Sequence, residues 1–128
     1  MSTPVKHHSP GFLAIVEDAK KRVNEIDIEE YKRLRATGGA GQLVDVREES
    51  EFAAMHADGA VHLSKGVIER DIETRFPDKD TPLILYCGGG YRSALASDNI
   101  QKMGYRNVIS LDGGWRAIEA SGLPLSKD

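Results

Sequence analysis

Residues 83 to 93 read Leu83-Ile84-Leu85-Tyr86-Cys87-Gly88-Gly89-Gly90-Tyr91-Arg92-Ser93, an apolar run that ends at a cysteine and continues through three glycines. The apolar run predicts a buried strand, which the glycines interrupt. From Ser93 to Met103 the sequence predicts a helix, and Gly104 ends it in the C-cap position. A strand, a glycine loop and a helix in this order are typical of an α/β protein.

The same alternation extends in both directions from this stretch. Further strands are predicted at residues 25–26, 43–46, 60–63 and 108–111. Further helices are predicted at 27–34, where Asp27 and Glu30 form a capping box, at 48–55, at 67–75, and after Gly113-Gly114-Trp115. Short apolar strands that alternate with helices predict an α/β fold, a parallel sheet of about five strands with helices on both faces.

A helical segment precedes this pattern. Ser9 suits the N-cap and Pro10 the first helical position, and Phe12, Ile15, Val16, Ala19 and Val23 recur at helical spacing. We therefore expect residues 1–24 to form a helical extension and residues 25–128 to form the domain itself. The extension either docks on the domain or meets a partner.

The composition excludes several classes of protein. The chain has 128 residues, with 17 Lys and Arg against 20 Asp and Glu, and a net charge of −3 gives no basis for non-specific nucleic-acid binding. No apolar run approaches the roughly 18 residues of a membrane span. The polar segment from Met1 to Pro10 does not resemble a targeting signal. We therefore expect a cytoplasmic protein that binds neither nucleic acid nor membrane.

The histidines and the cysteine give two further expectations. His7 and His8 are adjacent, but no other histidine stands at the spacing of metal ligands, so we expect the pair to be solvated and the protein to need no metal and no cofactor. The chain has a single cysteine, which excludes an internal disulfide.

Parallel sheets bind their ligands beyond the carboxyl ends of the strands. This rule selects Asp45 and Arg47, Ser64 and Lys65, the loop from Cys87 to Arg92, and the segment from Asp112 to Trp115. Lys65 is a candidate for steering anions at the rim of the site, because it follows the end of a predicted strand.

Cys87 stands between the strongest predicted strand and the N-terminus of a helix. Helix N-termini present unpaired N–H groups and partial positive charge, which together with Arg92 favour an anion. Because the thiolate is the nucleophilic form of cysteine, this position favours chemistry at Cys87. The alternative is that Cys87 is a small buried residue and Arg92 an exposed arginine of the first helical turn.

The glycines support an anion site more than a nucleotide site. Gly88, Gly89 and Gly90 allow backbone conformations in which successive N–H groups converge on one point. With Ser93 they also approximate the Gly-x-Gly-x-x-Gly pattern of dinucleotide sites, and Asp112 stands near the place of a ribose-binding acid. However, serine replaces the third glycine and only one more strand follows, which disfavours a dinucleotide fold.

Three motifs in order resemble the rhodanese (sulfurtransferase) family over about residues 27 to 125. They are Leu43-Val44-Asp45-Val46-Arg47-Glu48 with Glu51-Phe52, the segment from Met55 to Leu63, and the loop from Cys87 to Ser93 with the later Gly113-Gly114-Trp115. The match is particularly close to small single-domain members preceded by a helix. Met55 and Ala57 depart from the family pattern around His56. The resemblance implies structural roles for Asp45, Arg47 and His56.

The resemblance also implies a reaction. The thiolate of Cys87 would attack a sulfane sulfur of a small anionic donor such as thiosulfate and hold it as a persulfide. An external acceptor, cyanide or a thiol, would then remove the sulfur. Gly88, Gly89, Gly90, Tyr91 and Arg92 would form the cradle, with Arg92 as the clamp for the donor and the bulky Tyr91 narrowing the choice of donors.

Two other functions use the same cysteine. Related cysteine-dependent phosphatases use a Cys-x5-Arg loop, whereas only four residues separate Cys87 from Arg92 here and the loop contains no acid. The second alternative is a sulfur carrier or sensor with little turnover of its own, which delivers sulfur to a partner protein through the N-terminal helix. The carrier needs the same persulfide, so the sequence does not separate it from an enzyme.

Overall fold

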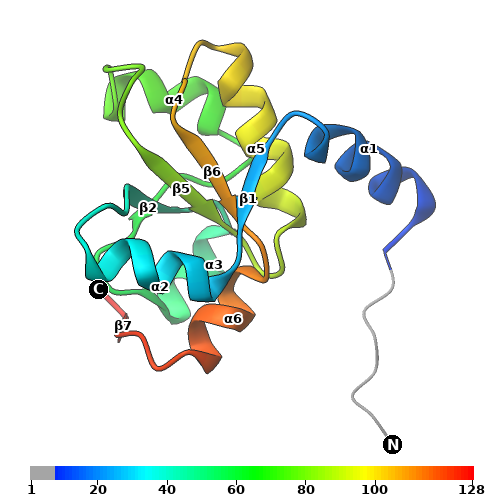
Figure 1. Cartoon of the computed structure of the whole chain (residues 1–128). Coiled ribbons are helices and arrows are strands. Elements are labelled where there is room, and N and C mark those ends of the chain that lie inside the picture. Colours follow the sequence, from blue (N-terminus) through cyan, green and yellow to red (C-terminus); the bar gives the residue numbers. More distant parts are fainter. Residues whose placement is uncertain (1–7) are drawn as a thin grey trace, which may run out of the picture.

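The computed structural model describes residues 8–128 and is built on one parallel sheet. Its five strands lie in the order β1 (Asn24–Ile26), β6 (Val108–Leu111), β5 (Leu83–Tyr86), β2 (Gln42–Asp45) and β4 (Val61–His62). All four pairings between neighbours are parallel, and β5 lies at the centre (Figure 1). The α/β fold and the sheet of about five parallel strands are therefore confirmed.

Alternate residues of β5, together with Cys87 directly after it, contribute to the two cores of the molecule. Leu83, Leu85 and Cys87 face a cluster that includes Ile68 and Ile72 of α4 (Ile68–Arg75) and Ala96 and Ile100 of α5 (Tyr91–Lys102). Ile84 and Tyr86 face the opposite cluster, with Tyr31 of α2 (Ile28–Ala36) and Ile118 of α6 (Gly114–Ala120). A strand covered on both faces is apolar at every position, which explains the uninterrupted apolar run.

The register brings the predicted site segments to one edge of the sheet. Asp45 at the end of β2 pairs with Tyr86 at the end of β5, and Leu85 pairs with Ser110 of β6. The loops that follow these three strands therefore leave the same edge, where helix α3 (Glu49–Ala54) also begins.

The N-terminal helix α1 (Pro10–Lys20) docks on α5 (Figure 1). Val16 and Ala19 are each 1% exposed, so α1 buries an apolar face there. Just beyond α1, the Arg22 guanidinium donates two hydrogen bonds of 2.9 and 2.8 Å to the buried carboxylate of Asp98 on α5. The predicted extension of residues 1–24 begins outside the described residues and ends where β1 starts.

Two local features differ from the sequence-based expectations. A small antiparallel pair of β3 (His56–Ala57) and β7 (Leu125–Ser126) was not predicted, because strands of two residues show no alternation. Only half of the predicted capping box forms: Asp27 accepts the N–H of Glu30 at 2.8 Å, while the Glu30 carboxylate pairs with Arg33 at 3.5 Å.

Within residues 8–128, no helix has both the length and the apolar character needed to cross a membrane.

Candidate active site

Cys87 is the first residue after β5 and is held at the start of α5. Its Sγ accepts a hydrogen bond from the backbone N–H of Gly90, 3.1 Å away, and lies 3.6 Å from Oγ of Ser93. The Ser93 hydroxyl is in turn 2.8 Å from that of Ser110 on β6, and both serines are fully buried. Gly90 has a φ of +108°, a conformation that glycine adopts readily and that other residues resist. The buried sulfur of Cys87 therefore accepts a hydrogen bond from the Gly90 N–H and donates one to the Ser93 hydroxyl.

Helix α6 holds the other side of the same loop. The N–H of Trp115 donates to the carbonyl of Cys87 at 2.6 Å, and the N–H of Arg116 donates to that of Gly88 at 3.2 Å. Gly114 sits so close that a Cβ there would lie 2.4 Å from the Cys87 carbonyl oxygen. The first turn of α6 therefore fixes the loop carbonyls, while the N–H of Gly90 remains directed at the sulfur.

The loop borders a cavity of about 450 Å³. Its lining comprises His8, Phe12, Glu51, Cys87, Gly88, Gly89, Tyr91, Arg92 and Arg116. Cys87 itself is only 1% exposed, so a reagent must enter the cavity to reach the sulfur. Of the predicted site residues, the structure brings six together: five line the cavity and Gly90 contacts the sulfur. Lys65 is not part of the lining; its N–H donates to the Val46 carbonyl at 3.0 Å.

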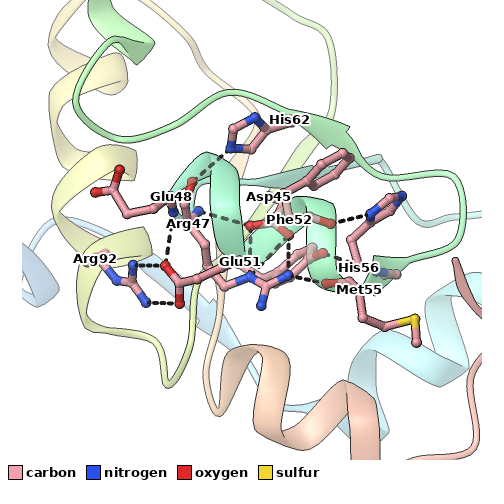
Figure 2. Close-up of polar contacts among 11 residues, drawn as sticks. Asp45, Arg47, Glu48, Glu51, Phe52, Met55, His56, His62 and Arg92 are labelled. Atoms are coloured by element: carbon pink, nitrogen blue, oxygen red, sulfur yellow. Dashed lines mark hydrogen bonds and ion pairs between the residues drawn. The ribbon is translucent and has the colours of Figure 1, made fainter. Parts of the chain in front are cut away.

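Arg92 is held in an ion pair with Glu51 of α3. Its two terminal nitrogens, Nη1 and Nη2, donate to the two carboxylate oxygens (Figure 2). The two hydrogen bonds are 2.8 and 3.3 Å long. The hydrogen bonds from Arg92 lower the pKa of Glu51, and those same bonds raise the pKa of Arg92. The pair is therefore charged at neutral pH, and Glu51 offsets the positive charge that Arg92 was predicted to offer an anion.

Arg116 is a lining residue that the sequence reasoning missed. It is exposed, and among the ion pairs of residues 8–128 its guanidinium has no acidic partner. The selected segment after the last predicted strand ended at Trp115, one residue short. A sequence signal existed, because the residue after a glycine turn at the active edge is well placed to reach the site.

A group of buried polar side chains packs next to the cysteine loop. It consists of Asp45, Arg47 and His56. Figure 2 shows the buried Arg47 paired with Asp45, at 2.8 Å, and donating to the Met55 carbonyl, at 2.7 Å. The Arg47 guanidinium also lies 4.6 Å from the centroid of the Trp115 ring. His56 Nδ1 is 2.8 Å from the Phe52 carbonyl, and the His56 and Phe52 rings stack at 3.7 Å. These contacts agree with the structural roles implied by the resemblance.

The prediction of a solvated His8 is wrong. Its ring packs 5.2 Å from Phe12 and 4.7 Å from Tyr91, because α1 docks beside the active-site loop. The neighbouring His7 lies outside the described residues. Among residues 8–128, no three His, Cys, Asp or Glu side chains gather in a way that could hold a metal ion.

Comparisons with known proteins agree with this site. Residues 27–121 match the rhodanese-like domain family. The thiosulfate sulfurtransferase GlpE of Pseudomonas aeruginosa is 33% identical over 93 residues, which cover 70% of this chain and 81% of that protein.

Two solved structures have the same fold. A protein of unknown function from Rhodopseudomonas palustris, described as a possible tyrosine phosphatase, is 25% identical with a TM-score of 0.82, covering 97% of this chain and 100% of the other. The polysulfide-sulfur transferase homodimer of Wolinella succinogenes is 24% identical with a TM-score of 0.75, covering 91% and 87%. At 97% coverage, the first alignment includes the α1 segment as well as the domain.

Proposed function

The chain belongs to the rhodanese-like domain family, and we propose that it is a sulfurtransferase that carries a sulfane sulfur as a persulfide on Cys87. One observation carries the proposal: the sulfur of Cys87 lies at the N-terminus of α5, accepts the Gly90 N–H at 3.1 Å and borders a cavity. Such a position favours a sulfur anion, whether thiolate or persulfide. The similarity to a thiosulfate sulfurtransferase supports the same chemistry.

The reaction proceeds in two displacements, with thiosulfate as the proposed donor. The Cys87 thiolate attacks the outer sulfur of thiosulfate; the new Sγ–S bond forms, the S–S bond of the donor breaks, and its electron pair leaves with sulfite. Cyanide or a thiol then attacks the terminal sulfur, and the electron pair returns to Sγ. Because Cys87 is the only cysteine in the chain, a thiol acceptor must come from another molecule.

In this proposal the backbone of the loop forms the cradle for the transferred sulfur, and Arg116 supplies the positive charge. The terminal sulfur of the persulfide would accept hydrogen bonds from the backbone N–H groups of the loop. These belong to Gly88, Gly89, Gly90, Tyr91 and Arg92. Because Glu51 holds Arg92, Arg116 is assigned as the first contact for an anionic donor. Lys65 remains a prediction for steering anions outside the cavity.

A phosphatase is the weaker candidate. The description of the Rhodopseudomonas palustris protein concerns that protein, and in this chain the loop has only four residues between Cys87 and Arg92. The Arg92 guanidinium is also paired with Glu51, which reduces the positive charge that it can offer to a phosphate in the loop. Hydrolysis of an aryl phosphate by the purified protein would favour the phosphatase.

The test measures turnover and the covalent state of Cys87 together. With thiosulfate and cyanide, the wild type is expected to make thiocyanate, and with thiosulfate alone mass spectrometry should find one extra sulfur atom on the peptide that contains Cys87. Cys87→Ser is expected to show neither. A persulfide with negligible turnover would favour the carrier alternative, and absence of both signals in the wild type would refute a persulfide mechanism.

A further inference from the structure

Helix α1 contributes a wall to the active-site cavity. His8, just before α1, and Phe12 line the cavity together with Tyr91, which belongs to the cysteine loop and begins α5. The Phe12 and Tyr91 rings meet edge to face, with their centroids 6.2 Å apart and an interplanar angle of 88°. At the other end of α1, Nζ of Lys20 lies 5.3 Å from the centroid of the Tyr91 ring. The helix therefore holds Tyr91 from two positions and presents an aromatic surface beside the thiol.

Binding of thiosulfate does not require an aromatic wall beside the thiol. It is a compact inorganic anion, and its recognition requires charge and N–H groups, which Arg116 and the loop supply. The cavity of about 450 Å³ lies within the roughly 300–1,000 Å³ range of pockets that bind organic molecules. Aromatic side chains that line a pocket favour apolar and especially aromatic groups of a ligand.

From this geometry we infer that the wall formed by Phe12 and Tyr91 selects organic sulfane-sulfur donors that pair an anionic head with an aromatic or other apolar group. The inference rests on the proposed sulfur transfer at Cys87 and specifies its substrate class. The anionic head meets Arg116 and the loop amides, while the apolar group contacts the α1 side of the cavity. Phe12 is then a specificity-determining residue that takes no part in bond formation.

Two thiosulfonate anions provide matched probes. Benzenethiosulfonate and methanethiosulfonate carry the same charged head and differ only in the phenyl or methyl group. With either donor, the Cys87 thiolate forms a bond to the terminal sulfur, the bond from that sulfur to the sulfonyl group breaks, and the electron pair leaves with a sulfinate. The ratio of kcat/KM for the two donors therefore isolates the contribution of the organic group.

The experiment compares this ratio in the full-length wild type, Phe12→Ala and Ile15→Ala. Ile15 lies on the same helix, is 56% exposed and is not part of the cavity lining, so Ile15→Ala is the control. The wild type is expected to prefer the phenyl donor. Because one aromatic contact contributes about 0.5–1.5 kcal/mol, Phe12→Ala should lower the ratio about fivefold and Ile15→Ala should leave it unchanged.

A second variant, Phe12→Leu, tests the inference in case Phe12→Ala disrupts the packing of α1. Leucine retains apolar volume against α5 but lacks the ring, so the ratio should fall about twofold even if Phe12→Ala unfolds. An equal ratio in the wild type and both Phe12 variants would refute the inference, while persulfide formation from either donor would leave the proposed function intact. Absence of persulfide with any donor would instead refute the proposed function.

Discussion

Two arginines at the cavity have different electrostatic roles. Glu51 holds Arg92 at 2.8 and 3.3 Å, and because Arg92 lowers the pKa of Glu51, the carboxylate stays ionised at neutral pH. The pair thus adds little net charge to the cavity and joins α3 to the cysteine loop. Arg116 has no such partner within the described part of the chain and supplies the positive charge of the cavity.

Arg116→Gln is therefore expected to impair binding of anionic donors. The KM for thiosulfate should rise about five- to tenfold, the size of a lost charge-assisted hydrogen bond, while kcat changes less. The measurement is the steady-state KM and kcat of the wild type and the variant, with thiosulfate and, for comparison, with an uncharged persulfide donor. Arg33→Gln changes the same charge on the exposed side of α2 and serves as the control. Equal loss with charged and uncharged donors would contradict the assignment of Arg116 to the anion.

At the scale of elements, the contact between α6 and the cysteine loop determines the shape of the site. Trp115 and Arg116 donate their N–H groups to the carbonyls of Cys87 and Gly88. The approach is possible only because Gly114 has no side chain, and its φ of +49° also favours glycine. A substitution here changes both the helix start and the loop.

Gly114→Ala is expected to lower the free energy of unfolding by about 1–3 kcal/mol from backbone strain, and by more from the close approach to the Cys87 carbonyl. Persulfide formation should slow at least tenfold, because the loop must shift. Gly122→Ala is the matched control: Gly122 has a φ of +82° but open space around its Cβ position. Urea denaturation and persulfide formation would be measured for both. Similar rates in the two variants would show that α6 does not shape the loop.

The elements were predictable where their signal is local. The apolar run of β5 and the end of α5 near Gly104 follow from neighbouring residues, and the structure has the strand at Leu83–Tyr86 and the helix at Tyr91–Lys102. The position of Cys87 between this strand and this helix follows from the same local signal, while its role stays a prediction. The pairing of Arg92 with Glu51, 41 residues away, was missed because it depends on the packing of α3 against the loop. The place of Phe12 beside Tyr91 was missed because periodicity shows that α1 has an apolar face but not what that face covers.

At the scale of the whole molecule, overall charge and local charge act in opposite directions. The chain carries a net charge of −3, so at long range it repels an anionic donor. At short range, we assign the attraction at the cavity to Arg116 and to the N–H groups of the loop. Salt screens both effects, with a Debye length of about 10 Å at 0.1 M, so the sign of the salt dependence reveals which one dominates.

We expect the local attraction to dominate in the wild type, so kcat/KM for thiosulfate should fall about two- to threefold as the ionic strength rises from about 0.02 to 0.3 M. In Arg116→Gln the main source of attraction is removed and the net repulsion remains, so kcat/KM should stay level or rise over the same range. Arg33→Gln carries the same net charge as that variant and should still show the fall of the wild type. Stopped-flow or steady-state rates in chloride salts provide the measurement. A parallel fall in all three proteins would mean that the attraction arises from the loop amides or another cation and not from Arg116.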